Sequence, residues 1–105
     1  MIAERSKVLI VEDDRVAREL LTEILRSEGH ETVALESGDQ AIARTGDAFD
    51  LCISDVRLGD GADGFAVLRA FKETTTPVIL ITAFGDVTGA MAAIQKGAYD
   101  YVSKP

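Results

Sequence analysis

Apolar residues are concentrated in short runs, each of which ends abruptly at a polar or charged residue. A strand that is buried on both faces of a parallel sheet gives such a nearly continuous apolar run, whereas a half-exposed strand alternates apolar and polar residues. Together with the short segment 31–35 and the weaker run 99–102, these runs predict five strands, at residues 8–11, 31–35, 51–55, 78–81 and 99–102.

The intervals between the strands show helical periodicity. From residue 15 to residue 28 the apolar positions follow one helical stripe, which Asp14 can cap at its start and Gly29 can end. A glutamine three residues after Ser37 gives the pattern of a capping box and predicts a short second helix.

Two further helices follow the third and fourth strands. The third begins after the glycine-containing loop 59–64, and Pro77 limits it because the residue before a proline disfavours helical geometry. The fourth spans residues 85–96 and is rich in small side chains. The order βαβαβαβαβ predicts a parallel α/β sheet with helices on both faces and right-handed crossovers. We expect residues 1–105 to form one domain, from which a closing fifth helix beyond the last strand is absent.

Composition narrows the functions open to this domain. Eighteen acidic and eleven basic residues give a formal charge of -7, which argues against nucleic-acid binding by this segment. The single cysteine, Cys52, excludes an intrachain disulfide, and its place in an apolar run predicts core packing. The single histidine, His30, follows a glycine in a turn and is expected to be exposed. No apolar run has signal-peptide or membrane-spanning length, so we expect a cytoplasmic protein without membrane contact.

Carboxylates end the first and third predicted strands. Glu12 and Asp13 follow the first strand and Asp55 ends the third, while Asp14 is assigned to the helix cap. The functional groups of open α/β sheets lie just outside the carboxyl ends of the strands, so these side chains are expected to converge. Like charges this close favour a bound cation, and hard oxygen donors suit Mg2+ or Mn2+. Asp55 is then available as a nucleophile that forms an aspartyl phosphate.

Two further polar groups follow the fourth and fifth predicted strands at this edge. Thr82 follows the fourth strand and can donate a hydrogen bond to a phosphate oxygen, and Lys104 follows the fifth and can place a positive charge near another. Either residue alone would be an ordinary surface group. Their occurrence together with the acid pair and Asp55, each at a strand end, predicts a phosphoryl-transfer site.

Four sequence blocks carry this pattern: VLIVEDD at 8–14, SDVRL at 54–58, ITAFGD at 81–86 and GAYDYVSKP at 97–105. Together they resemble the receiver domain of response regulators in two-component signalling, over essentially the whole chain. The resemblance implies a flavodoxin-like, doubly wound fold with strand order 2-1-3-4-5. The third and fourth blocks look most like receivers attached to sigma-54-dependent transcription activators.

The resemblance implies a role for each residue of the acidic site. Asp55 would take a phosphoryl group from the phosphohistidine of a sensor histidine kinase or of a phosphotransfer domain. Asp13 and Asp55 would ligate Mg2+ directly, the backbone carbonyl of Arg57 would be a further ligand, and Glu12 would act through a water molecule. Self-phosphorylation and self-dephosphorylation would be the extent of its enzymatic activity.

The resemblance also implies a switch. Thr82 and Lys104 would contact the phosphoryl group, and the bond from Lys104 to Pro105 would be cis. As Thr82 moves toward the phosphate, Tyr101 would rotate inward and change the surface of the fourth helix and fifth strand. Further partners would be the output domain of the full-length protein and a second copy in a homodimer.

The chain departs from the family pattern after its third strand. Family members commonly carry proline at the position of Gly59, and the segment from Asp60 to Gly64 is one residue longer here. This puts the geometry of the loop in doubt, but not the role of Asp55. The missing fifth helix is the second departure.

Two other functions are compatible with parts of this residue pattern. A pseudo-receiver would keep the fold without phosphorylation, but the complete set of acid pair, Asp55, Thr82 and Lys104 argues against it. A Mg2+-dependent phosphohydrolase would also use an aspartyl phosphate, but such enzymes usually carry a second aspartate two residues later, where this chain has Arg57.

Overall fold

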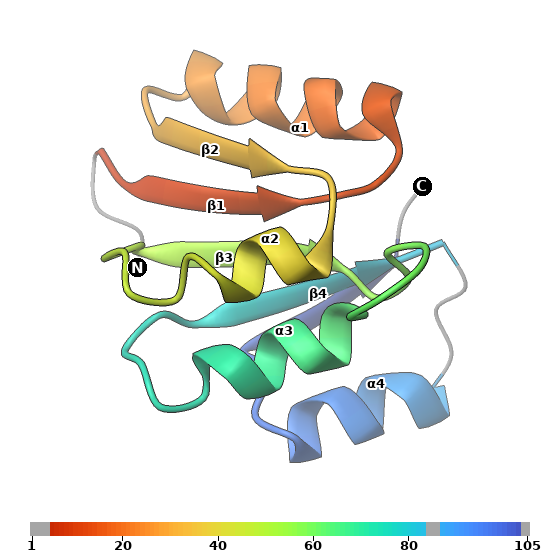
Figure 1. Ribbon diagram of the computed structural model, residues 1–105. Helices are drawn as coiled ribbons and strands as arrows, with labels where there is room; N and C mark the ends of the chain where they lie inside the picture. Colours follow the sequence, from red (N-terminus) through yellow and green to blue (C-terminus); the bar gives the residue numbers. More distant parts are fainter. Residues whose placement is uncertain (1–4, 84–86, 104–105) are drawn as a thin grey trace.

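Five parallel strands form one sheet with helices on both of its faces (Figure 1). The computed structural model describes residues 5–83 and 87–103. The strands are β1 (Lys7–Val11), β2 (Glu31–Leu35), β3 (Leu51–Asp55), β4 (Val78–Thr82) and β5 (Asp100–Ser103). The helices are α1 (Arg15–Ser27), α2 (Gly38–Ile42), α3 (Gly64–Phe71) and α4 (Val87–Gln95). The strand order β2-β1-β3-β4-β5, with every pair parallel, confirms the predicted architecture.

The main core lies between the sheet and the layer formed by α2, α3 and α4. Phe71 of α3 packs there in one cluster with Leu9 and Leu80 of the central strands, and all three are fully buried. The opposite face carries a smaller cluster, in which Leu25 of α1 packs against Ile10 of β1. β1 is therefore covered on both sides, which explains why its sequence is an uninterrupted apolar run.

The helix ends follow from local side-chain chemistry. Asp14 caps α1 by accepting a hydrogen bond from the backbone N–H of Ala17 at 2.8 Å, and Gly29 leaves the helix at a φ of +90°. Ser37 caps α2 in the same manner, with a hydrogen bond of 3.1 Å from Gln40 N–H. The three signals that predicted these helix ends are confirmed.

Several element limits differ from the prediction by one residue. β1 begins at Lys7 and β4 includes Thr82, because both residues still pair with a neighbouring strand. β5 begins at Asp100 rather than at Tyr99, whose side chain is 70% exposed. The predicted start of the last helix at Gly85 lies outside the described residues.

His30 is half-buried, so the prediction of an exposed side chain is wrong. Its Nδ1 accepts a hydrogen bond from the backbone N–H of Ser6 at 3.0 Å, which joins the turn after α1 to the start of β1. Cys52, by contrast, is fully buried in the core, as predicted, and this burial raises the pKa of its thiol to about 12.

The face of the sheet on which α1 lies is covered only in part. Beside α1 runs an apolar groove of about 400 Å³, lined by residues that include Leu20, Ile24, Ile81 and Val102. Leu20 is 57% exposed and Val102 44% exposed. Within the described part of the chain no helix follows β5. No helix among the described residues has the length and apolar character needed to cross a membrane.

Candidate functional site

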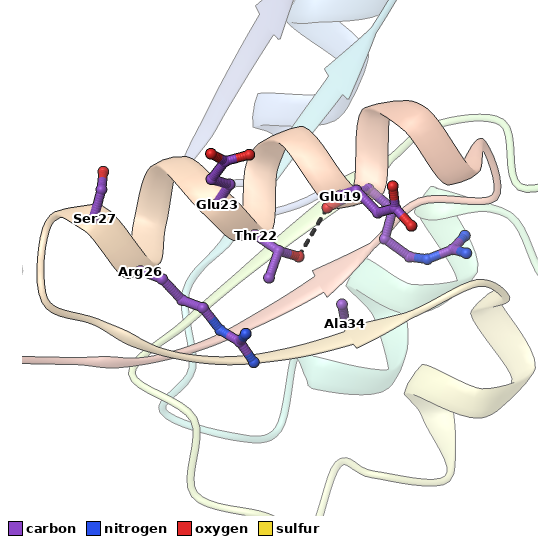
Figure 2. A pocket seen from close by; sticks show the side chains of 7 residues that line it. Glu19, Thr22, Glu23, Arg26, Ser27 and Ala34 are labelled. Atoms are coloured by element: carbon purple, nitrogen blue, oxygen red, sulfur yellow. Dashed lines mark hydrogen bonds between the residues drawn. The ribbon is translucent and has the colours of Figure 1, made fainter.

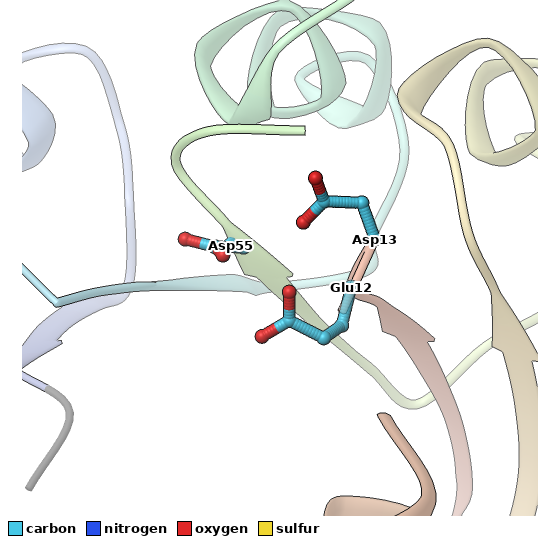
Figure 3. A group of neighbouring side chains, drawn as sticks. All are labelled: Glu12, Asp13 and Asp55. Atoms are coloured by element: carbon cyan, nitrogen blue, oxygen red, sulfur yellow. The ribbon is translucent and has the colours of Figure 1, made fainter. Parts of the chain in front are cut away.

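Three carboxylates meet where β1 and β3 end. The two strands are adjacent and parallel, and Val11 pairs with Ser54, so Glu12, Asp13 and Asp55 follow at the same edge of the sheet. One carboxylate oxygen from each of the three lies within 4.8 Å of the others (Figure 3). The predicted convergence of these three side chains is thus present in the structure.

The three carboxylates differ in their access to solvent. Glu12 is fully buried, Asp55 is 8% exposed and Asp13 is exposed. The Oε2 atom of Glu12 accepts a hydrogen bond from the backbone N–H of Asp14 at 3.2 Å, which fixes the buried carboxylate beside the strand end. Buried negative charge is costly unless opposite charge compensates it, and the exposed side of the cluster leaves a route for a cation.

The donor set fits a hard divalent cation. It offers carboxylate oxygens from three side chains, and the cluster contains no thiol or imidazole. Mg2+ is commonly bound by one or two carboxylates and keeps several water ligands, so three carboxylates with one open side satisfy its needs. Within the described residues this is the one group of three such side chains close enough to share a metal ion.

Arg18 supports the acid pair from α1, a contact that the sequence analysis missed. Its Nη1 atom donates hydrogen bonds to the backbone carbonyl of Glu12 at 2.9 Å and to that of Asp13 at 3.4 Å. The positive guanidinium therefore lies close to the acidic cluster while it holds the backbone after β1. The sequence signal for this contact is the position of the arginine, which lies one turn inside α1 and five residues after Asp13.

The loop after Asp55 is held close to the strand end. The backbone N–H of Arg57 donates to Oδ1 of Asp55 at 3.4 Å, and that of Gly64 donates to the carbonyl of Val56 at 2.8 Å. A side chain at Gly64 would collide with the backbone of Asp55, so only glycine fits this close approach. The sequence analysis did not anticipate this role for Gly64.

Gly59 has a backbone conformation that explains its departure from the family pattern. Its φ is +70°, whereas the ring of proline fixes φ near -65°. The proline that is common at this position would therefore not fit the loop as it is folded here. A Cβ atom on Gly59 would lie 3.6 Å from Oδ2 of Asp13, so this turn of the loop borders the acidic cluster.

The remaining predicted residues lie on the two neighbouring strands or beyond them. Thr82 ends β4 next to β3, because its predecessor Ile81 pairs with Asp55, and its side chain is buried. Tyr101 lies in the middle of β5, half-buried, against the main core. Lys104, together with the predicted cis bond that follows it, lies outside the described residues.

A second hollow, between α1 and β2, has different chemistry (Figure 2). This groove of about 650 Å³ is lined by polar side chains of α1 and by Ala34 of β2. Arg26 is engaged there with the Thr32 hydroxyl at 3.1 Å, and the Thr22 hydroxyl donates to the carbonyl of Arg18 at 2.8 Å. No group of metal-binding side chains gathers in this groove among the described residues, so the acidic cluster is the stronger candidate site.

Comparisons with known proteins agree with this arrangement. The family model of the response regulator receiver domain matches residues 8–105. The response regulator protein FleR of Pseudomonas aeruginosa is 44% identical over 103 residues, which cover 95% of this chain and 22% of FleR. The DNA-binding transcriptional regulator NtrC of Klebsiella pneumoniae is 37% identical over 105 residues, which cover 97% of this chain and 22% of NtrC. The chain thus spans about a fifth of the length of these two relatives.

A solved structure shows the same likeness in three dimensions. The BeF3 activated DrrB receiver domain superposes with a TM-score of 0.84 at 31% identity. The match covers 100% of this chain and 86% of that chain. The fold of this chain is therefore shared by a solved receiver domain of related sequence.

Proposed function

Because this chain belongs to the receiver-domain family of response regulators in two-component systems, we propose that it is a phosphorylation-dependent switch with Asp55 as the phosphoryl acceptor. Receiver domains are regulators rather than classical enzymes. The observation that carries the proposal is the meeting of Glu12, Asp13 and Asp55 at the ends of adjacent strands, with ligand atoms within 4.8 Å of one another.

Glu12, Asp13 and Asp55 would hold Mg2+, for which Mn2+ is the expected substitute. The backbone carbonyl of Arg57 is the further ligand in this proposal. Bound there, the divalent cation would neutralise charge on the phosphoryl oxygens. The three carboxylates bring ligand oxygens within 4.8 Å of one another, which supports binding of a small divalent cation.

Asp55 would perform the transfer itself. One of its carboxylate oxygens attacks the phosphorus of a phosphohistidine, an O–P bond forms, the N–P bond of the donor breaks, and the imidazole leaves with the bonding electron pair. The carboxylate of Asp55 is well placed for this role because its backbone is held by Gly64 and one of its oxygens accepts the Arg57 N–H. Hydrolysis of the resulting acyl phosphate by water would reset the switch.

Thr82 and Lys104 would bind the phosphoryl oxygens, Thr82 through its hydroxyl and Lys104 through its charge. Thr82 ends the strand beside Asp55, which supports its part in this proposal. Movement of Thr82 toward the phosphoryl group would allow the half-buried Tyr101 ring to turn further inward. The surface around α4 and β5 would then differ between the two states.

The proposed partners follow from the relatives. A sensor histidine kinase or a phosphotransfer domain would supply the phosphoryl group, and an output domain in the full-length protein would receive the signal. FleR and NtrC are a response regulator and a DNA-binding transcriptional regulator, which supports control of transcription as the output. Homodimer formation is a further proposal that follows from the family.

Binding of beryllofluoride, a phosphoryl mimic, tests this function, and the BeF3 activated state of DrrB supports the choice of probe. We expect 19F NMR signals of the bound mimic that require Mg2+ and that disappear in Asp55→Asn. Asp47→Asn makes the same chemical change in the turn after α2 and should bind as the wild type does. A folded wild-type chain that binds no beryllofluoride would contradict the proposal and favour a pseudo-receiver.

A further inference from the structure

The lengthened loop after β3 rests on the first turn of α2. Both lie at the carboxyl edge of the sheet, where the loop leads from β3 into α3 (Figure 1). Gly38, the first residue of α2, is buried. An ideal Cβ atom on Gly38 would collide with the backbone oxygen of Ala62 and would lie 2.9 Å from its carbonyl carbon. The contact is thus one backbone against another, with no flexible side chain between them.

A second contact joins the same two segments. Gly61 has a φ of +85°, and a Cβ atom there would collide with Oδ2 of Asp39, the second residue of α2. Gly38 therefore permits an approach of two backbones that a larger residue would prevent, whereas Gly61 meets only the end of the Asp39 side chain and favours glycine through its positive φ. The contact falls within residues 60–64, the segment that the sequence predicts to be one residue longer than the family pattern.

The loop has little freedom to retreat from this contact. At one end Leu58 is buried in the core. At the other end Gly64 lies against the backbone of Asp55 and donates its N–H to Val56. Between these anchors, Gly59 borders the carboxylate of Asp13. A displacement of Ala62 would therefore be passed along the loop toward the acidic cluster.

We propose that the first turn of α2 positions the loop after Asp55, and that a glycine at residue 38 is required for the lengthened loop to leave the metal site intact. Gly38 is thus a positioning residue, which acts through Ala62 and touches no ligand itself. This inference rests on the proposed function, since it concerns binding of Mg2+ by the acidic cluster.

The test is a titration of the 105-residue chain with MgCl2 by isothermal titration calorimetry. Gly38→Ala should weaken Mg2+ binding about tenfold, in the range found when a residue supporting a metal ligand is altered. Gly46→Ala is the matched control, because a Cβ atom there would meet nothing within 4 Å. It should bind Mg2+ as the wild type does.

Deletion of Ala62 gives the second arm of the test, because it shortens the loop and removes the residue that Gly38 contacts. In the shortened loop Gly38→Ala should change the Mg2+ affinity by less than about twofold, which is a rescue that a general loss of structure would not give. If Gly38→Ala fails to fold in the original loop, this comparison decides alone, and a tenfold loss in the shortened loop contradicts the proposal.

The outcomes separate this inference from the proposed function. A folded wild-type chain that does not bind Mg2+ would contradict the function. A wild-type chain that binds Mg2+, together with a Gly38→Ala variant of equal affinity, would overturn the inference alone.

Discussion

The acidic residues of the cluster differ in their exposure to solvent and in their hydrogen bonds. Glu12 is buried and fixed by the Asp14 N–H, whereas Asp13 is exposed. Arg18 contacts the backbone of both residues rather than their carboxylates. Ligand oxygens of the three carboxylates lie within 4.8 Å of one another, and like charges at such distances repel one another.

This repulsion predicts opposite effects of Asp13→Asn on stability and on metal binding. Without Mg2+ the variant should be more stable than the wild type by about 1 kcal/mol, because a like charge close to two others has been removed. With Mg2+ it should gain less stability than the wild type gains, because one ligand is weaker. Both effects are measured by urea unfolding, first in Mg2+-free buffer and then at MgCl2 concentrations that differ tenfold. Glu36→Gln, at an exposed position outside the cluster, should change neither, and a destabilised Asp13→Asn in Mg2+-free buffer would refute the explanation.

Cys52 gives the chain a pH dependence of its own. Its thiol has a pKa of about 12 in the folded state, above the ordinary value of 9.0, because burial disfavours the thiolate. The unfolded chain therefore loses this proton first, and the free energy of unfolding should fall by about 1.4 kcal/mol per pH unit as the pH rises above 9. Below pH 9 the contribution is complete.

Urea unfolding between pH 8 and pH 11 tests this expectation. The wild type should lose stability more steeply than Cys52→Ala, which lacks the thiol. A thiol reagent at pH 9 should modify Cys52 rapidly in urea and slowly in the folded chain. Equal slopes for the two proteins, or rapid modification of the folded chain, would show that the thiol is not held in the core.

Among the secondary-structure elements, the capped starts of α1 and α3 fix the segments that lead into these helices from β1 and β3. Asp14 caps α1 directly after the acid pair. Asp63, near the end of the loop 59–64, caps α3 and accepts a hydrogen bond from Ala66 N–H at 2.9 Å. Each cap satisfies a backbone donor at a helix start and fixes the direction in which the chain enters the helix.

Removal of the α3 cap should therefore be measurable. We expect Asp63→Ala to reduce the free energy of unfolding by about 1 kcal/mol, the usual effect of losing an N-cap aspartate. Asp60→Ala removes the same charge from the same exposed loop, where no capping hydrogen bond depends on it. It should change stability by less than about 0.5 kcal/mol. Equal losses in both variants, measured by urea unfolding, would show that charge rather than capping is responsible.

The strands and the carboxylate cluster are predictable from the sequence, whereas contacts between segments distant in the chain are not. β2 and β3 were predicted to the residue, because apolar patterning and turn residues act locally. The meeting of Glu12 with Asp55 was also predictable, since parallel strands bring their carboxyl ends to one edge. The contact of Gly38 with Ala62 was not, because it depends on how far α2 and the loop approach one another in the folded chain. The half-buried state of His30 depends in the same way on Ser6, 24 residues away.

At the scale of the whole molecule, the sheet separates a well-packed face from an open one. The main core and most buried side chains lie under α2, α3 and α4. The groove beside α1 exposes Leu20 and Val102, and the acidic cluster lies at its edge, since Glu12 also lines this groove.

Intact-mass measurement shows whether Asp55 is the residue that accepts the phosphoryl group. The chain is incubated with Mg2+ and acetyl phosphate, and its mass is compared with that of Asp55→Asn and of Asp47→Asn treated in the same way. We expect the wild type and Asp47→Asn each to gain one phosphoryl group. Asp55→Asn should gain none, and no protein should gain one when Mg2+ is removed by a chelator. A folded wild-type chain that gains no mass, or an equal gain by Asp55→Asn, would contradict this role of Asp55.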